Sequence, residues 1–252
     1  MRKKKPRHAS VMSTQCLSKK AEIQYRTALQ KIAQEVGRII NLRYDGSNDS
    51  VLEIMDALDE YSVLIEGWAQ RVAQRFVDAV ERDNAKTWMQ QSREMSRELR
   101  RQIECTPVGH VTRSIVHEQV KYIKSLPLEA ADRVYDIQNR AIEAVINGER
   151  PEHFEQMIAD SGNVAKSRAK LIARTELGRA TQALTQSRAQ AIGSQGYTWR
   201  TAKDGDVRHS HFKKEGEYIP WDQPPTLDGM TGHAGTLPNC RCYCEVSFSD
   251  SE

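Results

Sequence analysis

The chain lacks long apolar runs, and this absence limits the classes of protein to which it can belong. No segment approaches the roughly 20 consecutive apolar residues that a membrane-spanning helix needs, although 38% of the 252 residues are hydrophobic. The first residues, Met1 to His8, are mostly basic and lack the apolar stretch of a secretory signal. We therefore expect a protein that folds in the cytosol and has no membrane partner.

The chain also has few cysteines. There are five, which is an odd number. A disulfide framework is not expected in a cytosolic chain of this length. Three of the five, Cys240, Cys242 and Cys244, lie close together near the end of the sequence. These three residues therefore need an explanation other than a disulfide framework.

Acidic residues are absent from the first 20 positions, although the net charge of the whole chain is only +3. We predict a basic disordered arm over residues 1–20. It either binds nucleic-acid phosphates by releasing their counterions or keeps the protein soluble. The candidate nucleic-acid contacts are Arg2, Lys3, Lys4, Lys5 and Arg7.

Apolar residues from Val51 to Val80 recur at steps of three, four or seven, which predicts one long amphipathic helix. Similar patterns predict helices over residues 22–42, 84–105, 110–124, 129–146 and 163–192. Alternating apolar residues predict strands over residues 197–201 and 240–248. The fold class is therefore mainly α, with a helical body over residues 21–195 and a small, loop-rich α+β unit over residues 196–252.

Histidines and cysteines with the chemistry of zinc ligands concentrate in this last unit. We consider His211, Cys240 and Cys242, with a fourth ligand from His209, His233 or Cys244, as a tetrahedral zinc site. In the alternative interpretation, Cys240, Cys242 and Cys244 form the buried face of one strand, because a free cysteine packs as a small apolar residue. The sequence leaves both interpretations open.

Polar residues before His211 favour a structural network over catalysis. Asp204 or Asp206 is expected to form an ion pair with Arg208 and so to hold this loop against the strand that contains Trp199. The chain has no Walker A loop, dinucleotide fingerprint or Gly-x-Ser-x-Gly motif. We predict that it is not an enzyme.

The order of the motifs resembles the phage Mu F-like family of minor head proteins over residues 165–246. Ala-Arg-Thr-Glu at 173–176 precedes Trp-Arg-Thr at 199–201, a segment from Asp204 to His211, a loop rich in Gly and Pro, and Pro-Asn-Cys-Arg-Cys at 238–242. The chain departs from the family pattern where Lys214-Glu215-Gly216 replaces Leu-Asp-Gly. The positions that match are Arg174, Thr175, Glu176, Trp199, Asp204, Arg208, His211, Pro238, Cys240, Arg241 and Cys242.

The resemblance implies a minor capsid protein of a tailed bacteriophage that acts in head morphogenesis. Such a protein is assembled in the host cytoplasm, becomes part of the virion and docks near the portal vertex. The implied partners are the portal protein, the major capsid or scaffolding protein, and packaged DNA through the N-terminal arm. The alternative is a zinc-dependent enzyme or effector that is carried in the phage head.

Overall fold

A computed structural model describes residues 9–13, 18–92, 97–147 and 153–249. The chain is mainly α, with long helices followed by short antiparallel strands, as predicted. Contacts divide it into two compact units. The sheet unit comprises Met1–Glu22, Phe76–Ile115 and Arg174–Glu252, and the helical unit comprises Ile23–Arg75 and Val116–Ala173. The strands are thus grouped with residues 76–115 and the end of a long helix, whereas the domain boundary expected after residue 195 stays a prediction.

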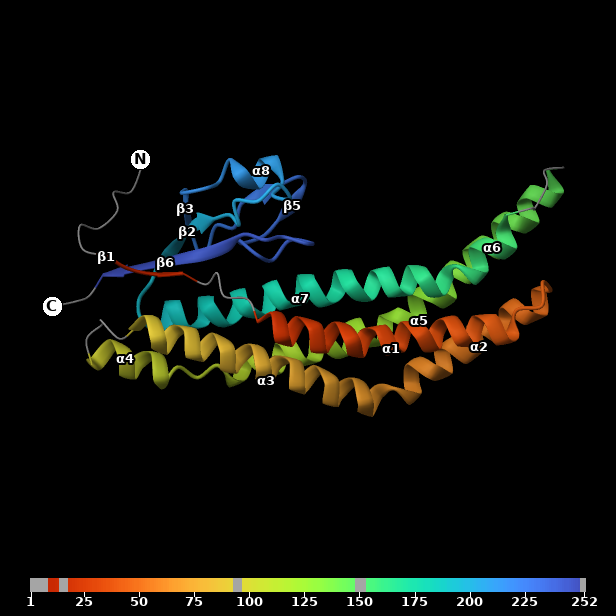
Figure 1. The fold of residues 1–252 in the computed structure, drawn as a ribbon, viewed down its shortest axis with the longest axis horizontal. Helices are drawn as coiled ribbons and strands as arrows, with labels where there is room; N and C mark the ends of the chain where they lie inside the picture. The colour runs from red at the N-terminus through yellow and green to blue at the C-terminus, as the bar shows by residue number, and fades with distance from the viewer. Residues whose placement is uncertain (1–8, 14–17, 93–96, 148–152, 250–252) are drawn as a thin grey trace. The chain divides into compact units, whose positions relative to one another are not determined.

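The elements follow one another along the chain as labelled in Figure 1. The helices are α1 (Lys19–Arg43), α2 (Asn48–Leu64), α3 (Glu66–Gln91), α4 (Arg97–Glu104), α5 (Gly109–Ile146), α6 (Phe154–Ala159), α7 (Ser161–Ala191) and α8 (His209–Phe212). The strands are β1 (Ala9–Ser13), β2 (Gly196–Arg200), β3 (Tyr218–Pro220), β4 (Thr226–Leu227), β5 (Met230–Thr231) and β6 (Tyr243–Ser249). The described part of the chain contains no helix that meets the length and hydropathy needed to cross a membrane.

Three predicted helix boundaries are wrong. The boundary predicted between residues 80 and 84 lies inside α3, which is continuous from Glu66 to Gln91. The single helix predicted from Val51 to Val80 is interrupted at Ile65, where ψ is −2° and the regular helical geometry ends. Conversely, the two helices predicted over 110–124 and 129–146 form one helix, α5, which passes through Pro127. Proline removes one helical hydrogen bond, but buried side chains on both sides of it, Leu126 and Ala130 among them, pack both halves.

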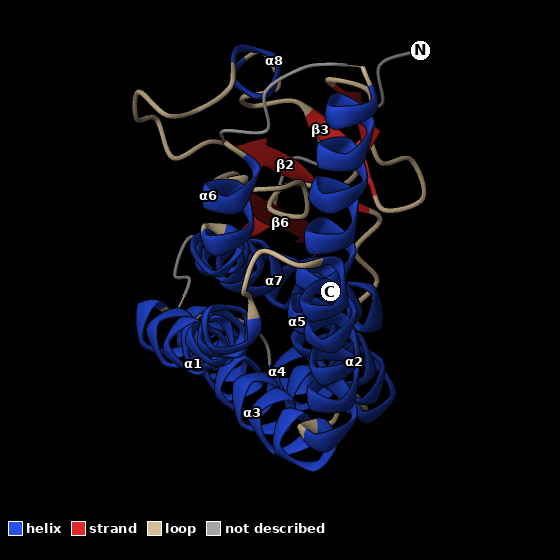
Figure 2. Cartoon of the chain, turned by 90° about the vertical axis from the view of Figure 1, so that its right-hand side faces the viewer, coloured by secondary structure: helices blue, strands red, loops and turns tan. Residues whose placement is uncertain are grey.

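The sheet unit contains a four-stranded antiparallel sheet with the order β1-β6-β2-β3, seen in red in Figure 2. Trp199 of β2 is paired with Cys244 of β6, and Tyr197 is paired with Val246. β1 lies within the predicted disordered arm, so Ala9–Ser13 are ordered as a strand where the sequence indicates none. Arg2, Lys3, Lys4, Lys5 and Arg7 lie outside the described residues, and their predicted role stays untested.

Helices complete the core of the sheet unit. Trp88 of α3 and Ala189 of α7 belong to the same buried cluster as Tyr197, Trp199 and Val246 of the sheet. α3 and α7 are also joined by a buried polar network, in which Arg188 bonds to Asn84 and pairs with Glu81 at 2.6 Å. The sheet therefore packs on α3 and α7 through apolar side chains, and the polar network holds these two helices to each other.

The helical unit is built on close helix packing. A Cβ atom on Gly162 of α7 would lie 2.7 Å from the Cα atom of Gly37 of α1, so position 162 needs glycine. The Tyr25 hydroxyl donates to Gln119 Oε1 across 2.9 Å in the interior. Leu29, Ile54 and Leu58 are among the fully buried side chains. Residues far apart in the sequence thus form one core in this unit.

Candidate functional site

Three of the six candidate metal ligands converge in the sheet unit. His211 Nδ1 lies 3.4 Å from Cys240 Sγ and 3.6 Å from Cys242 Sγ. The three atoms lie within 4.8 Å of one another. The exposed fractions are only 2% for His211, 8% for Cys240 and 4% for Cys242. The result is a buried cluster of one imidazole and two thiols.

Local backbone geometry brings the two cysteines together. Asn239 has a φ of 54°, in the left-handed region, and the Cys240 N–H donates to the carbonyl of Leu237 at 2.9 Å. Cys240 and Cys242 therefore lie in a turn and its exit, before β6 begins at Tyr243. α8 is a single short turn of helix, and it presents His211 to this segment.

Cys240 and Cys242 influence each other's ionisation. A hydrogen bond from the Cys242 thiol lowers the pKa of Cys240 to about 5, although burial opposes this shift. The same hydrogen bond, together with burial, raises the pKa of Cys242. The pair therefore loses its first proton more readily than an isolated cysteine does, and it resists losing the second.

Only one of the two ring nitrogens of His211 has a polar partner. Its ring packs edge-on against Trp199, with 5.7 Å between the ring centroids. Its Nδ1 atom faces the two sulfurs, but its buried Nε2 atom has no hydrogen-bond partner among the described residues.

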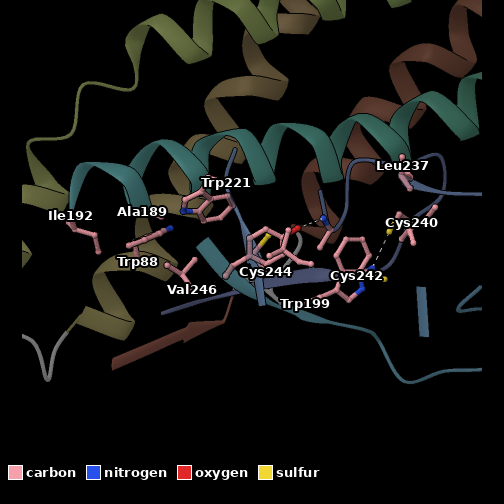
Figure 3. Packing of buried hydrophobic residues seen from close by; sticks show 14 of the residues in the cluster. Trp88, Ala189, Ile192, Trp199, Trp221, Leu237, Cys240, Cys242, Cys244 and Val246 are labelled. Carbon is pink, nitrogen blue, oxygen red and sulfur yellow. Dashed lines mark hydrogen bonds between the residues drawn. The ribbon is translucent and has the colours of Figure 1, made fainter. Parts of the chain in front are cut away.

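The other three candidate ligands lie elsewhere. His209 is exposed on α8. His233 Nδ1 lies 3.3 Å from the Tyr197 hydroxyl, which also accepts a hydrogen bond from the Ala234 N–H at 3.0 Å. Cys244 is buried on β6 opposite Trp199, and Figure 3 places it further along the core, towards Val246. None of the three is part of the cluster around His211.

The buried-face interpretation also describes part of this segment. Cys240, Cys242, Cys244 and Val246 are buried, whereas the intervening Arg241, Tyr243 and Glu245 are half-buried. Figure 3 shows the cysteines in the same apolar core as Trp199 and Leu237. All three cysteines are therefore buried, as the buried-face interpretation expects, and two of them also lie next to His211.

The loop before His211 is held by a different arginine from the one expected. Arg241, not Arg208, pairs with Asp204 at 2.5 Å and with Asp206 at 2.8 Å. Arg208 instead donates to the carbonyl of Pro238 at 2.8 Å. Proximity in sequence favoured Arg208, but the fold brings Arg241 to Asp206, which is 35 residues away in sequence, and also to Asp204. Both arginines join the loop at 204–208 to the segment at 238–241.

The Ala-Arg-Thr-Glu motif of α7 supports the turn before Cys240. Thr175 Oγ1 accepts a hydrogen bond from the Asn239 N–H at 3.2 Å. Glu176 is buried and pairs with Arg179 at 2.9 Å, and Arg179 Nε donates to the Thr236 carbonyl at 2.9 Å. Arg174 is exposed. The motif thus contributes contacts that position the turn.

Sequence reasoning missed several residues that position the site. Arg179 carries no motif signal beyond its place three residues after Glu176. Glu215 accepts hydrogen bonds from the Thr201 backbone at 2.7 Å and hydroxyl at 2.9 Å, and pairs with Arg200 at 3.2 Å. Glu215 therefore ties the end of β2 to the segment after α8.

Comparisons with known proteins support the resemblance that the motifs indicate. Residues 135–245 match the sequence model of the family described as Phage Mu protein F like protein, so this segment is Mu F-like. The class to which the match points is that of phage head-morphogenesis proteins. No solved structure matches the chain.

A curated relative is described as an uncharacterized protein of Haemophilus influenzae. It is 33% identical over 123 residues, which are 49% of this chain and 26% of that protein. The chain thus spans about a quarter of the length of the relative it matches.

Proposed function

We propose that the protein is a minor head protein of a tailed bacteriophage, and that it acts in head morphogenesis by docking near the portal vertex. The observation that carries the proposal is that residues of the Mu F-like motifs bond to one another. Thr175 bonds to Asn239, Arg208 to Pro238, and Arg241 to Asp204. Such mutual contacts suit a rigid binding scaffold, whereas a catalytic role would direct several polar groups into an open cleft.

A groove in the helical unit supports the docking part of the proposal. It has a volume of about 580 Å³, and Tyr44, Ile142, Val145, Ile146 and Phe154 are among its lining residues. Val145 and Ile146 are 59% and 76% exposed. Exposed apolar patches mark interaction surfaces, and a groove of this kind suits the apolar face of an amphipathic helix. We assign the groove to a helix of a portal subunit.

The basic arm extends the proposal to packaged DNA. Its lysines and arginines are suited to neutralising phosphates without reading base sequence. Contact with the major capsid or scaffolding protein is a further part of the proposed assembly role. Location in the virion follows from that role.

Copy number in purified particles tests the proposal first. Quantitative mass spectrometry should find from a few copies up to about one portal ring's worth of this protein per head. Absence from both mature heads and their precursors would reject the minor head role. It would favour an effector with the His211, Cys240 and Cys242 cluster at its centre.

The groove is tested by a matched pair of substitutions. Val145→Asp places a charge in the groove, whereas Val63→Asp places one on α2 at a side chain that is 70% exposed and does not line the groove. We expect Val145→Asp to reduce incorporation into heads at least tenfold and Val63→Asp to leave it unchanged. Equal incorporation of the two folded variants would reject the groove as the docking site.

A further inference from the structure

We propose that His211 Nδ1, Cys240 Sγ and Cys242 Sγ bind one Zn²⁺ ion, with a water molecule as the fourth ligand. This inference does not depend on the proposed head-assembly role. It rests on the positions of the three ligand atoms, on the backbone that brings them together and on the donor chemistry of the cluster.

The distances between ligand atoms match a tetrahedral zinc site. Zn–S bonds of about 2.3 Å and Zn–N bonds of about 2.0–2.1 Å place the nitrogen and a sulfur of one tetrahedron roughly 3.5 Å apart. The two distances from His211 Nδ1 to sulfur are 3.4 and 3.6 Å. The same tetrahedron places its two sulfurs roughly 3.8 Å apart, and the sulfurs of Cys240 and Cys242 lie within 4.8 Å of each other. A small rotation of the cysteine side chains therefore suffices for one ion to bind all three atoms.

Hydrogen bonding alone explains this geometry less well. In a neutral imidazole, Nδ1 either donates its one N–H or accepts with its one lone pair, so in both tautomers it makes one linear hydrogen bond to sulfur and not two. Yet both sulfurs face Nδ1 at nearly the same distance. One cation shared by the nitrogen and both sulfurs accounts for both contacts.

The turn at Asn239 removes the main objection to a Cys-x-Cys zinc site. On an extended strand, alternate residues lie roughly 7 Å apart along one face, which is wide for two ligands of one ion. Here Cys240 and Cys242 precede β6, and their sulfurs lie within 4.8 Å of each other. The tertiary fold therefore creates a ligand spacing that the sequence pattern alone does not favour.

The ion would join two segments of the sheet unit that are 29 residues apart in sequence. Arg208 and Arg241 already bond these segments to each other at the surface. No fourth His, Cys, Asp or Glu joins the cluster within the described ranges, so water is left to complete the tetrahedron. Zinc at this position would clamp α8 to the turn before β6.

Metal content of the full-length, untagged protein, purified under reducing conditions, is the direct test. We expect about one zinc per chain in the wild type and a loss of at least tenfold in Cys240→Ala and Cys242→Ala. Cys244→Ala is the matched control, because Cys244 is equally buried but outside the cluster. Cys105→Ala is a control at an exposed cysteine. Both controls should keep the metal.

Cobalt substitution of the wild type keeps the test decisive if the cysteine variants do not fold. Co²⁺ in the site should give thiolate-to-cobalt charge-transfer absorption and the intense visible bands of tetrahedral coordination. A folded wild type that binds neither Zn²⁺ nor Co²⁺, or metal retained by both folded Cys240→Ala and Cys242→Ala, would overturn the proposal. Neither outcome alters the copy number in heads, so the two proposals fail separately.

Discussion

Replacing Gly178 by alanine reverses the usual effect of this substitution in a helix. In a helix interior, alanine is about 1 kcal/mol more favourable than glycine. A Cβ atom at position 178 of α7, however, would lie 2.3 Å from the carbonyl oxygen of Gly235. That oxygen belongs to the backbone of the turn before Cys240, so it cannot move away as the end of a flexible side chain can.

The expected change in stability is the cost of the clash with Gly235 minus the gain in helix propensity. Overpacking costs about 1–3 kcal/mol, and a 2.3 Å contact with a backbone atom belongs to the upper part of that range, about 2–3 kcal/mol. The gain in helix propensity offsets about 1 kcal/mol of this cost. We expect Gly178→Ala to lower the free energy of unfolding by about 1–2 kcal/mol and the melting temperature by roughly 5 °C. Urea denaturation monitored by circular dichroism measures the first quantity, and calorimetry measures the second.

Gly67→Ala is the matched control. A Cβ atom there meets only the end of the Arg71 side chain, at 3.7 Å. This variant should be as stable as the wild type or more stable by up to about 1 kcal/mol. If Gly178→Ala were also as stable as the wild type, the close approach of α7 to Gly235 would not constrain position 178, and the reasoning would be refuted.

Three further predictions concern charged groups. Arg188→Leu should lower the free energy of unfolding by about 2–3 kcal/mol, because Asn84 and Glu81 lose a buried cationic partner; a loss below about 0.5 kcal/mol in urea denaturation would contradict this. Arg168→Ala should change the free energy of unfolding by less than about 0.5 kcal/mol, because both side chains of its ion pair with Glu129 are exposed. A clearly larger loss in the same assay would contradict the small contribution expected of an exposed ion pair. Burial raises the pKa of Glu215, but hydrogen bonds from Thr201 and Arg200 outweigh it, so the pKa lies below the ordinary value of 4.5. The stabilisation from Glu215 is therefore present above pH 4.5 and is lost as the pH falls through the lower pKa of the folded state; the stability of Glu215→Gln should depend less on pH in this acidic range, and an unchanged pH profile would refute the assignment.

Local pattern was sufficient for the elements whose signal lies within their own sequence. The helix predicted over 163–192 corresponds to α7, and the strand predicted over 197–201 corresponds to β2. The prediction divided α5 into two helices on either side of Pro127, and proline weakens a helix locally. Packing around Leu126 and Ala130 outweighs that local effect. Local and tertiary preferences conflict at this proline, and the tertiary contacts decide the structure.

The burial of Trp68 and Trp88 is a second feature that local sequence does not predict. Both are tryptophans in helical patterns, and either suits a docking surface. In the structure Trp68 is half-buried, whereas Trp88 is 1% exposed and belongs to the core beneath the sheet. Periodicity reports which face of a helix is apolar, but not which segment from elsewhere in the chain covers that face.

Periodicity and ordered motifs are local properties, so they were enough to predict the mainly α class, the strand-containing end of the chain and the resemblance to the Mu F-like family. Tertiary contacts, in contrast, determine that Cys240 and Cys242 cluster with His211, whereas His209, His233 and Cys244 lie outside the cluster. They also determine that Asp204 pairs with Arg241 and not with Arg208. The physical reason is that both outcomes depend on the turn at Asn239 and on the pairing of β6 with β2, which bring together residues about 30 positions apart.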